Sequence, residues 1–128
     1  LMTRNKNFTS KIIGYLDENI RKHFNIEKSS SKEIVQSNKL DIHTNKHAND
    51  FITLDSYHNT LMNIDKIISS PYYVEYDKKR NSLKYYGKVD QYVCVVVRLD
   101  KKEYFVSTFY PLSKKKIDKL KSKEDPNN

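Results

Sequence analysis

Apolar residues recur at helical spacing in two segments of the chain. Residues 8–26 predict an amphipathic helix. Residues 56–69 predict a second helix, which Asp55 or Ser56 caps and Pro71 ends. The apolar positions of the two helices are Ile12, Ile13, Leu16, Ile20 and Phe24 in the first, and Tyr57, Leu61, Ile64, Ile67 and Ile68 in the second.

The segments between these two helices carry weaker patterns. Residues 27–37 are polar and rich in serine, which predicts a flexible connection. The short apolar patch at 39–43 fits either an edge strand or the start of a helix, and the pattern does not separate the two. Residues 46–51 predict one or two helical turns.

The second half of the chain changes to the pattern of β-strands. Four apolar runs rich in Tyr and Val are separated by charged turns, and the last two predict a hairpin. The near-continuous apolar run at 92–99 predicts a central strand covered on both faces. Pro111 ends the sheet, and a lysine-rich helix is predicted at 113–122, with the chain end fraying over 121–128. The predicted strands are 72–76, 83–86, 92–99 and 104–110.

This order of elements predicts an α+β fold in which N-terminal helices pack on a four-stranded antiparallel meander. The 128 residues, 37% hydrophobic and 31% charged, suit one domain and exclude a multidomain enzyme. Within that domain, we expect a helical scaffold and linker at 8–38 and a core at 39–120. The mean hydropathy of -0.83 argues against a membrane span.

Motifs for nucleotide cofactors, disulfides and zinc ribbons are missing. With two glycines, the chain has neither a GxGxxG motif nor a P-loop, so no cofactor is predicted. The single cysteine, Cys94, cannot form an internal disulfide, and its place in a valine run predicts a buried core residue.

The chain is strongly basic, since 24 Lys and Arg outnumber 16 Asp and Glu and give a net charge of +8. This charge favours an anionic partner, and nucleic acid is the first candidate. The 10 tyrosines strengthen that interpretation because Tyr stacks on exposed bases, although Tyr also fills sheets and Lys also serves solubility. No secretory signal opens the chain, so a cytoplasmic location is expected; whether the chain is part of a longer protein stays open.

Three histidines crowd into the stretch before the sheet, namely His43, His47 and His58. As a zinc site they would need a carboxylate such as Asp50 or Asp55, and the glutamate of an HExxH motif is absent. As a general acid and base they suit RNA cleavage, in which one group deprotonates the 2′-hydroxyl and another protonates the leaving 5′-oxygen. They also fit surface or capping positions.

The end of the last predicted strand brings hydroxyl groups together. Thr108 and Tyr110 are two residues apart, so their side chains face the same side of the sheet and can hold a phosphate. Arg98 interrupts an apolar strand, where it either marks the strand end or binds a phosphate. Lys46, beside His47, is a further candidate cation. A shift of one residue in register decides which face Arg98 shares.

Together these motifs resemble a known family, the phage-type branch of the Barnase/EndoU/colicin/RelE-like (BECR) nucleases. The resemblance covers residues 39–120, and its most specific part is the strand end Thr108-Phe109-Tyr110-Pro111. The other motifs that carry it are residues 42–47, the helix from His58 to Pro71, residues 95–99 and residues 105–107.

The resemblance implies a metal-independent RNase, carried on a phage protein or as a toxin module, that cleaves RNA, with tRNA one candidate, to a 2′,3′-cyclic phosphate. It also implies an acidic immunity or antitoxin partner and no cofactor. A non-catalytic RNA-binding or interaction module, and a phage-encoded inhibitor or structural protein, are the alternatives. The implied acid and base are His47 and His58, and His43 can replace either of them. The other implied catalytic residues are Thr108, Tyr110 and Arg98. The implied substrate-binding residues are His43, Lys46, Ser107 and Lys84.

Overall fold

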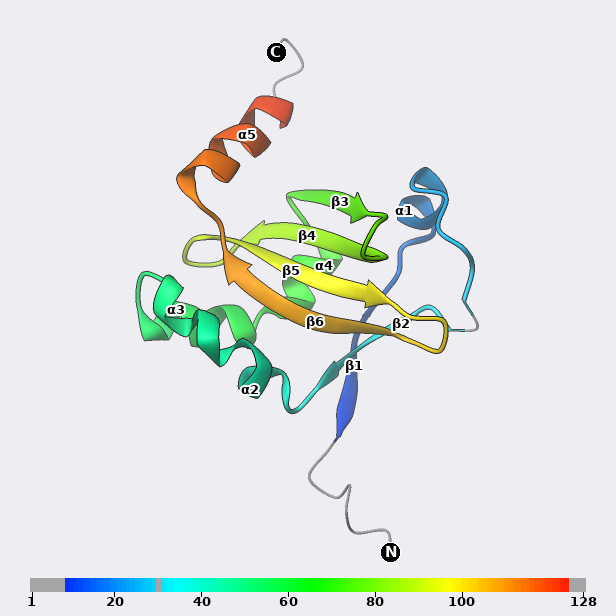
Figure 1. Ribbon diagram of the computed structural model, residues 1–128, viewed down its shortest axis with the longest axis horizontal. Coiled ribbons are helices and arrows are strands. Elements are labelled where there is room, and N and C mark those ends of the chain that lie inside the picture. The colour runs from blue at the N-terminus through cyan, green and yellow to red at the C-terminus, as the bar shows by residue number, and fades with distance from the viewer. Residues whose placement is uncertain (1–8, 30, 125–128) are drawn as a thin grey trace, which may run out of the picture.

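The computed structural model describes residues 9–29 and 31–124. Within these residues, six strands form one mixed sheet in the order β1-β2-β6-β5-β4-β3 (Figure 1). β2 runs parallel to β6, and the other neighbouring pairs are antiparallel. The predicted α+β class is confirmed, but the predicted four-stranded antiparallel sheet is wrong because β1 and β2 extend it. The strands are β1 (Ser10–Tyr15), β2 (Glu33–Ser37), β3 (Tyr73–Asp77), β4 (Ser82–Lys88), β5 (Tyr92–Leu99) and β6 (Tyr104–Pro111).

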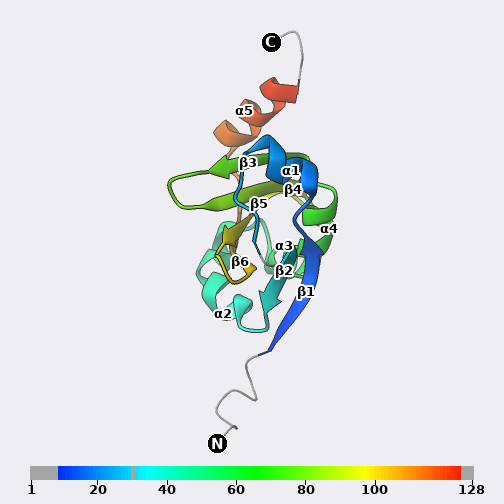
Figure 2. The same ribbon diagram turned by 90° about the vertical axis from the view of Figure 1, so that its right-hand side faces the viewer.

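One face of this sheet carries the main hydrophobic core. Short helices pack against it, and the rings of Tyr57 and Phe109 stack with centroids 5.4 Å apart. In both views α5 lies on the other side of the sheet from α2 (Figures 1 and 2). The described helices are α1 (Glu18–His23), α2 (Leu40–Thr44), the 3₁₀ helix η2 (Asn45–Asp50), α3 (Leu54–Leu61), α4 (Ile64–Ser69) and α5 (Lys114–Glu124).

The N-terminal region differs most from the prediction. Residues 10–15 form β1 rather than a helix, and the predicted flexible connection contains β2, whose Ile34 is fully buried. Asp17 then caps the short helix α1 by accepting a hydrogen bond from the backbone N–H of Asn19. Pairing of β1 with β2, which in turn pairs with β6, outweighs the helical spacing of the apolar residues. β1 also packs closely on α4, since a Cβ at Gly14 would lie 3.2 Å from the Ile68 side chain.

The predicted helix at 56–69 is two helices. α3 ends at Leu61 and α4 begins at Ile64, so the chain bends between them. The cap of α3 is Thr53, whose Oγ1 accepts from the N–H of Ser56 at 3.0 Å, and neither Asp55 nor Ser56 fills that position. The apolar patch at 39–43, which fitted either an edge strand or the start of a helix, belongs to the helix α2. The helical turns predicted at 46–51 are η2.

The last helix, α5, runs to Glu124 and therefore past the predicted start of fraying at residue 121. Residues 125–128 lie outside the described residues. Of the helices in the described residues, none has the length and apolarity needed to cross a membrane.

Candidate active site

Strand register places the predicted sheet residues on one face. Residues directly opposite each other on neighbouring strands point to the same side. Arg98 is opposite Phe105, and Val96 is opposite both Lys84 and Thr108. This face points away from the main core. We call it the open face and define it by Ser82, Lys84, Val96, Arg98, Phe105 and Thr108.

A β-bulge lies in the middle of the open face. The register between β5 and β6 shifts between Val96 and Val97, so Ser107 is left without an opposite residue. The Ser107 hydroxyl donates a hydrogen bond to the Val96 carbonyl at 3.3 Å. Because of the bulge, Phe105 and Thr108 share a face although they are three positions apart in the sequence.

Helix α5 covers one end of the same sheet face. Its Leu120 is buried against Tyr86 and Cys94, and Tyr110 packs at the edge of this cluster. Tyr110 is opposite Cys94 in the register of β5 and β6, and burial raises the pKa of the Cys94 thiol to about 11. Cys94 is fully buried, as its sequence context predicted.

A carboxylate that the sequence analysis did not single out lies beside this end of the sheet. Glu75 on β3 is opposite Lys84, accepts a hydrogen bond from the Tyr86 hydroxyl at 2.8 Å and lies 3.5 Å from Lys116 Nζ. Burial opposes its ionisation, but Tyr86 and the nearby lysines outweigh burial and hold the Glu75 pKa below its ordinary range. Its signal in the sequence is the alternation of Tyr73, Glu75 and Asp77, which puts the three on one side of a strand.

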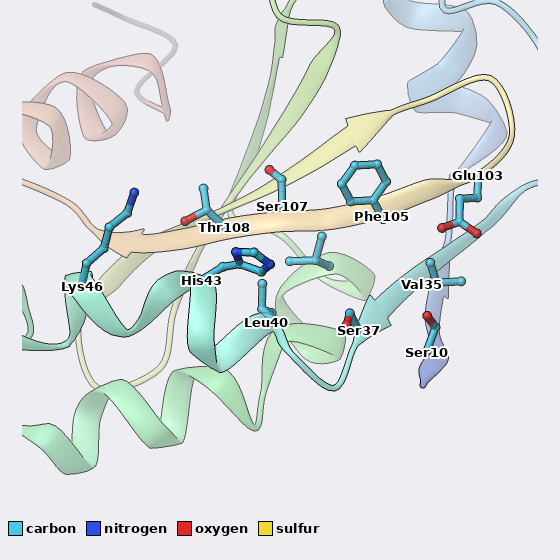
Figure 3. A pocket seen from close by; sticks show the side chains of 11 residues that line it. Ser10, Val35, Ser37, Leu40, His43, Lys46, Glu103, Phe105, Ser107 and Thr108 are labelled. Atoms are coloured by element: carbon cyan, nitrogen blue, oxygen red, sulfur yellow. The ribbon is translucent and has the colours of Figure 1, made fainter. Parts of the chain in front are cut away.

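A groove of about 500 Å³ opens where α2 packs beside β6. Figure 3 shows the His43 ring beneath β6 near Thr108, with Lys46 at one end of the groove and Glu103 at the other. The Thr108 Oγ1 is buried and has no hydrogen-bond partner in the described part of the chain. Four predicted site residues therefore line one groove, namely His43, Lys46, Ser107 and Thr108.

His47 lies one helical turn after His43, on η2. Its ring centroid is 6.1 Å from that of Tyr110, and its Nδ1 is 3.5 Å from a carboxylate oxygen of Asp50. The His47 side chain is 27% exposed. His43 and His47 thus approach β6 at two neighbouring positions, marked by Thr108 and Tyr110.

A partly buried hydrogen-bond network holds α2 in this place. The Tyr57 hydroxyl on α3 donates to the Asp41 carboxylate and lies 2.8 Å from Thr44 Oγ1. Tyr57 is fully buried, and burial raises its pKa to about 12. The sequence predicted Tyr57 as a core residue, but the spacing of apolar positions gives no signal for the role of its hydroxyl.

The third histidine is not part of this arrangement. His58 is exposed on α3, which packs on the core side of the sheet, and its ring lies against Tyr57 at 5.2 Å. Across residues 9–29 and 31–124, no group of three or more His, Cys, Asp or Glu side chains is arranged to hold a metal ion. The zinc arrangement considered from the sequence, with all three histidines as ligands, is therefore not assembled in these residues.

Comparison with known proteins found no match among curated proteins or solved structures. A family model does match, that of the phage-Barnase-EndoU-ColicinE5/D-RelE like nuclease3, over residues 10–119. The match begins at β1, earlier than the resemblance seen in the sequence, and it includes every predicted site residue. The chain belongs to this nuclease family, as the motifs had indicated.

Proposed function

We propose that the chain is a metal-independent endoribonuclease with His43 and His47 as its acid and base. The observation that carries the proposal is the pair of imidazoles aligned along β6 in a chain of a nuclease family. Thr108 and Tyr110, the neighbours of the two imidazoles, are two strand residues apart, which is roughly 7 Å. A phosphodiester has room between imidazoles spaced in this way.

The proposed reaction is an internal transesterification. One imidazole takes the proton of the ribose 2′-hydroxyl while the 2′-oxygen forms a bond to phosphorus. The bond from phosphorus to the 5′-oxygen breaks, and the other imidazole gives that oxygen its proton. The products are a 2′,3′-cyclic phosphate and a 5′-hydroxyl, and no redox partner or metal ion is needed for the balance.

Cations around the groove are proposed to stabilise the charge that develops on phosphorus. Lys46, in the groove beside the two histidines, is the candidate for contact with the reacting phosphate, and Arg98 and Lys84 on the open face neutralise neighbouring phosphates. Ser107 and Thr108 orient the substrate in the groove. His58, which the resemblance implied as an acid or base, has no role in this proposal because it does not line the groove between α2 and β6.

RNA is the proposed substrate, with tRNA one candidate, because the reaction needs a 2′-hydroxyl and the chain has a net charge of +8. The proposal extends to a toxin or phage-associated effector that acts in the cytoplasm, either by itself or delivered there within a larger protein. An acidic immunity or antitoxin protein would complement the basic open face and block the groove.

The test is incubation of the purified protein with total RNA in EDTA, followed by analysis of the fragment ends. We expect fragments that end in 2′,3′-cyclic phosphate, and no cleavage of an oligonucleotide with a 2′-deoxy sugar at the cut site. The His43→Ala/His47→Ala double variant, purified in parallel, controls for contaminating nucleases. Cleavage that EDTA abolishes and zinc restores would contradict the proposal. Tight RNA binding without cleavage would favour the non-catalytic binding module instead.

A further inference from the structure

We infer that the groove between α2 and β6 is a nucleobase subsite, in which Thr108 recognises the edge of one base of single-stranded RNA. This inference deepens the proposed function because it assigns a class of ligand to the groove. It rests on the proposed function because the base belongs to the RNA substrate proposed there. The groove volume of about 500 Å³ is within the range typical of small-molecule sites.

The lining of the groove suits an aromatic, uncharged ligand. Val35, Leu40 and Phe105 supply apolar surface, and Phe105 is half-buried on the open face opposite Arg98. A phosphate against these apolar side chains would lose part of its hydration, and the ammonium group that lines the groove, that of Lys46, lies at one end of it. A base loses little by leaving water and gains contact with the Phe105 ring.

The Thr108 hydroxyl is the feature that points to a ligand. Its oxygen is buried and unpartnered among the described residues, whereas buried hydroxyls in proteins are usually hydrogen-bonded. A hydroxyl both donates and accepts, as the edges of bases do. The neighbouring Ser107 hydroxyl is already bonded to the Val96 carbonyl, so Thr108 is the better reader of the base.

The charges at the two ends of the groove give the bound nucleotide a direction. Lys46 lies at the end near His47, and the exposed carboxylate of Glu103 lies at the other end (Figure 3). Phosphate is attracted to the Lys46 end and repelled from the Glu103 end. A base seated against Phe105 and Thr108 therefore leaves its phosphate beside His43 and His47, where cleavage is proposed.

The test measures base binding and base preference separately. Uncharged nucleosides are titrated into isotope-labelled protein, and the amide resonances of Val35, Leu40 and Phe105 are followed by NMR. We expect one nucleoside to shift these resonances more strongly than the other three. Dinucleotide substrates then give the ratio of kcat/KM between the preferred base and the others.

Thr108→Val removes the hydroxyl and keeps the shape of the side chain. We expect the preferred nucleoside to bind roughly tenfold more weakly and the kcat/KM ratio to fall by a similar factor, as loss of one hydrogen bond predicts. Thr108→Ser should restore both within about twofold, and Ser69→Ala, which removes an exposed hydroxyl on α4 outside the groove, is the control and should change neither. The Tm of Thr108→Val should stay at or above that of the parent because the hydroxyl had no partner.

Two results would overturn the inference: inorganic phosphate, but no nucleoside, shifting the groove resonances, or a base ratio unchanged in Thr108→Val. Failure of the nuclease proposal gives a different pattern. Nucleosides would then still bind the groove and depend on Thr108, while RNA stayed intact. Cleavage of RNA without any nucleoside binding or base preference would leave the nuclease proposal standing and remove the subsite.

Discussion

The position of His43 depends on hydrogen bonds between α2 and α3. Asp41 and Thr44, which flank His43 on α2, both contact the Tyr57 hydroxyl on α3. A helix of five residues has little stability of its own, so these contacts and the packing of Leu40 fix its orientation. The imidazole at the groove is therefore held by tertiary contacts rather than by the local sequence.

The two histidines proposed as acid and base can be separated from the third by substitution. His43→Ala and His47→Ala should each reduce kcat/KM for RNA by ~10²–10⁴-fold, the usual contribution of general acid–base catalysis. His58→Ala is the matched control, because it removes an exposed imidazole on the core side of the sheet and should leave cleavage within about twofold of the parent. Parent-like rates in both test variants would make these histidines structural.

Glu75 makes stability depend on pH in a defined direction. Its pKa is lowered in the folded protein, so its contribution is complete above the ordinary carboxyl range and is lost as the pH falls through the folded-state pKa. We expect Glu75→Gln to lower the Tm by roughly 3–5 °C near pH 7 and the difference to shrink towards about pH 3. Thermal melting across this range measures the effect, with Asp65→Asn on an exposed helix position as control. A difference that is the same at every pH would rule out the ion pairs as its source.

Several candidate residues were predictable from the sequence because side chains alternate along a strand. Thr108 and Tyr110 had to share a face, and the observed register adds Lys84 and Arg98 to that face. Glu75 was not predicted, because its importance comes from Tyr86 and from Lys116 on a distant helix. The bulge at Ser107 is also invisible in the sequence, since it arises from the pairing of β5 with β6.

At the scale of elements, local patterns predicted the strands of the second half but not those of the first. β5 and β6 form a hairpin with a short connection, so their apolar runs and the turn between them lie together in the sequence. β2 depends instead on pairing with β6, about seventy residues further along the chain, and β1 joins the sheet by pairing with β2. Such long-range pairing outweighed the helical spacing of Ile12, Ile13 and Leu16, and the apolar face of 56–69 gave no sign of the break between α3 and α4.

Helix α5 contacts the sheet through one buried apolar side chain and through lysines that lie over tyrosine rings and near Glu75. Leu120 is 2% exposed in its contact with Tyr86 and Cys94, and the helix is otherwise lysine-rich. We expect Leu120→Ala to cost about 2 kcal/mol, at the low end for a buried leucine because the site is peripheral. The Tm should fall by roughly 4–8 °C, which thermal melting would measure.

Loosening of α5 has a second measurable consequence at Cys94. This thiol is buried and its pKa is raised to about 11, so a thiol reagent should react with it slowly in the parent protein. In Leu120→Ala the reaction should be at least about tenfold faster, because local opening exposes the thiol. Lys119→Ala, an exposed position on the same helix, is the control and should react as the parent does. Equal labelling rates in all three proteins would show that α5 does not shield the sheet.

At the scale of the molecule, the sheet divides the protein into two unlike sides. Helices and the main core cover one face, whereas the other carries Lys84, Arg98 and the groove and is covered only at its α5 end in the described residues. The chain has a net charge of +8. If a nucleic acid binds to the open face, the cations there neutralise its phosphates, and the phosphates release their bound counterions. We therefore expect a polyanion to bind to the open face rather than to the helix side.

This division predicts how RNA binding depends on salt. The affinity for a single-stranded 2′-O-methyl RNA, which cannot undergo the proposed reaction, should fall steeply between about 50 and 300 mM salt, because each neutralised phosphate adds about -0.7 to the slope of log K against log salt. Lys84→Gln on the open face should reduce that slope by about 0.7, since it removes one phosphate contact. Lys66→Gln removes the same charge from α4 on the helix side and should leave the slope unchanged.

Fluorescence anisotropy of the labelled RNA gives the three slopes. A flat salt response in the parent would exclude the phosphate backbone as the main ligand, and equal slopes for the two variants would move the binding surface away from the open face.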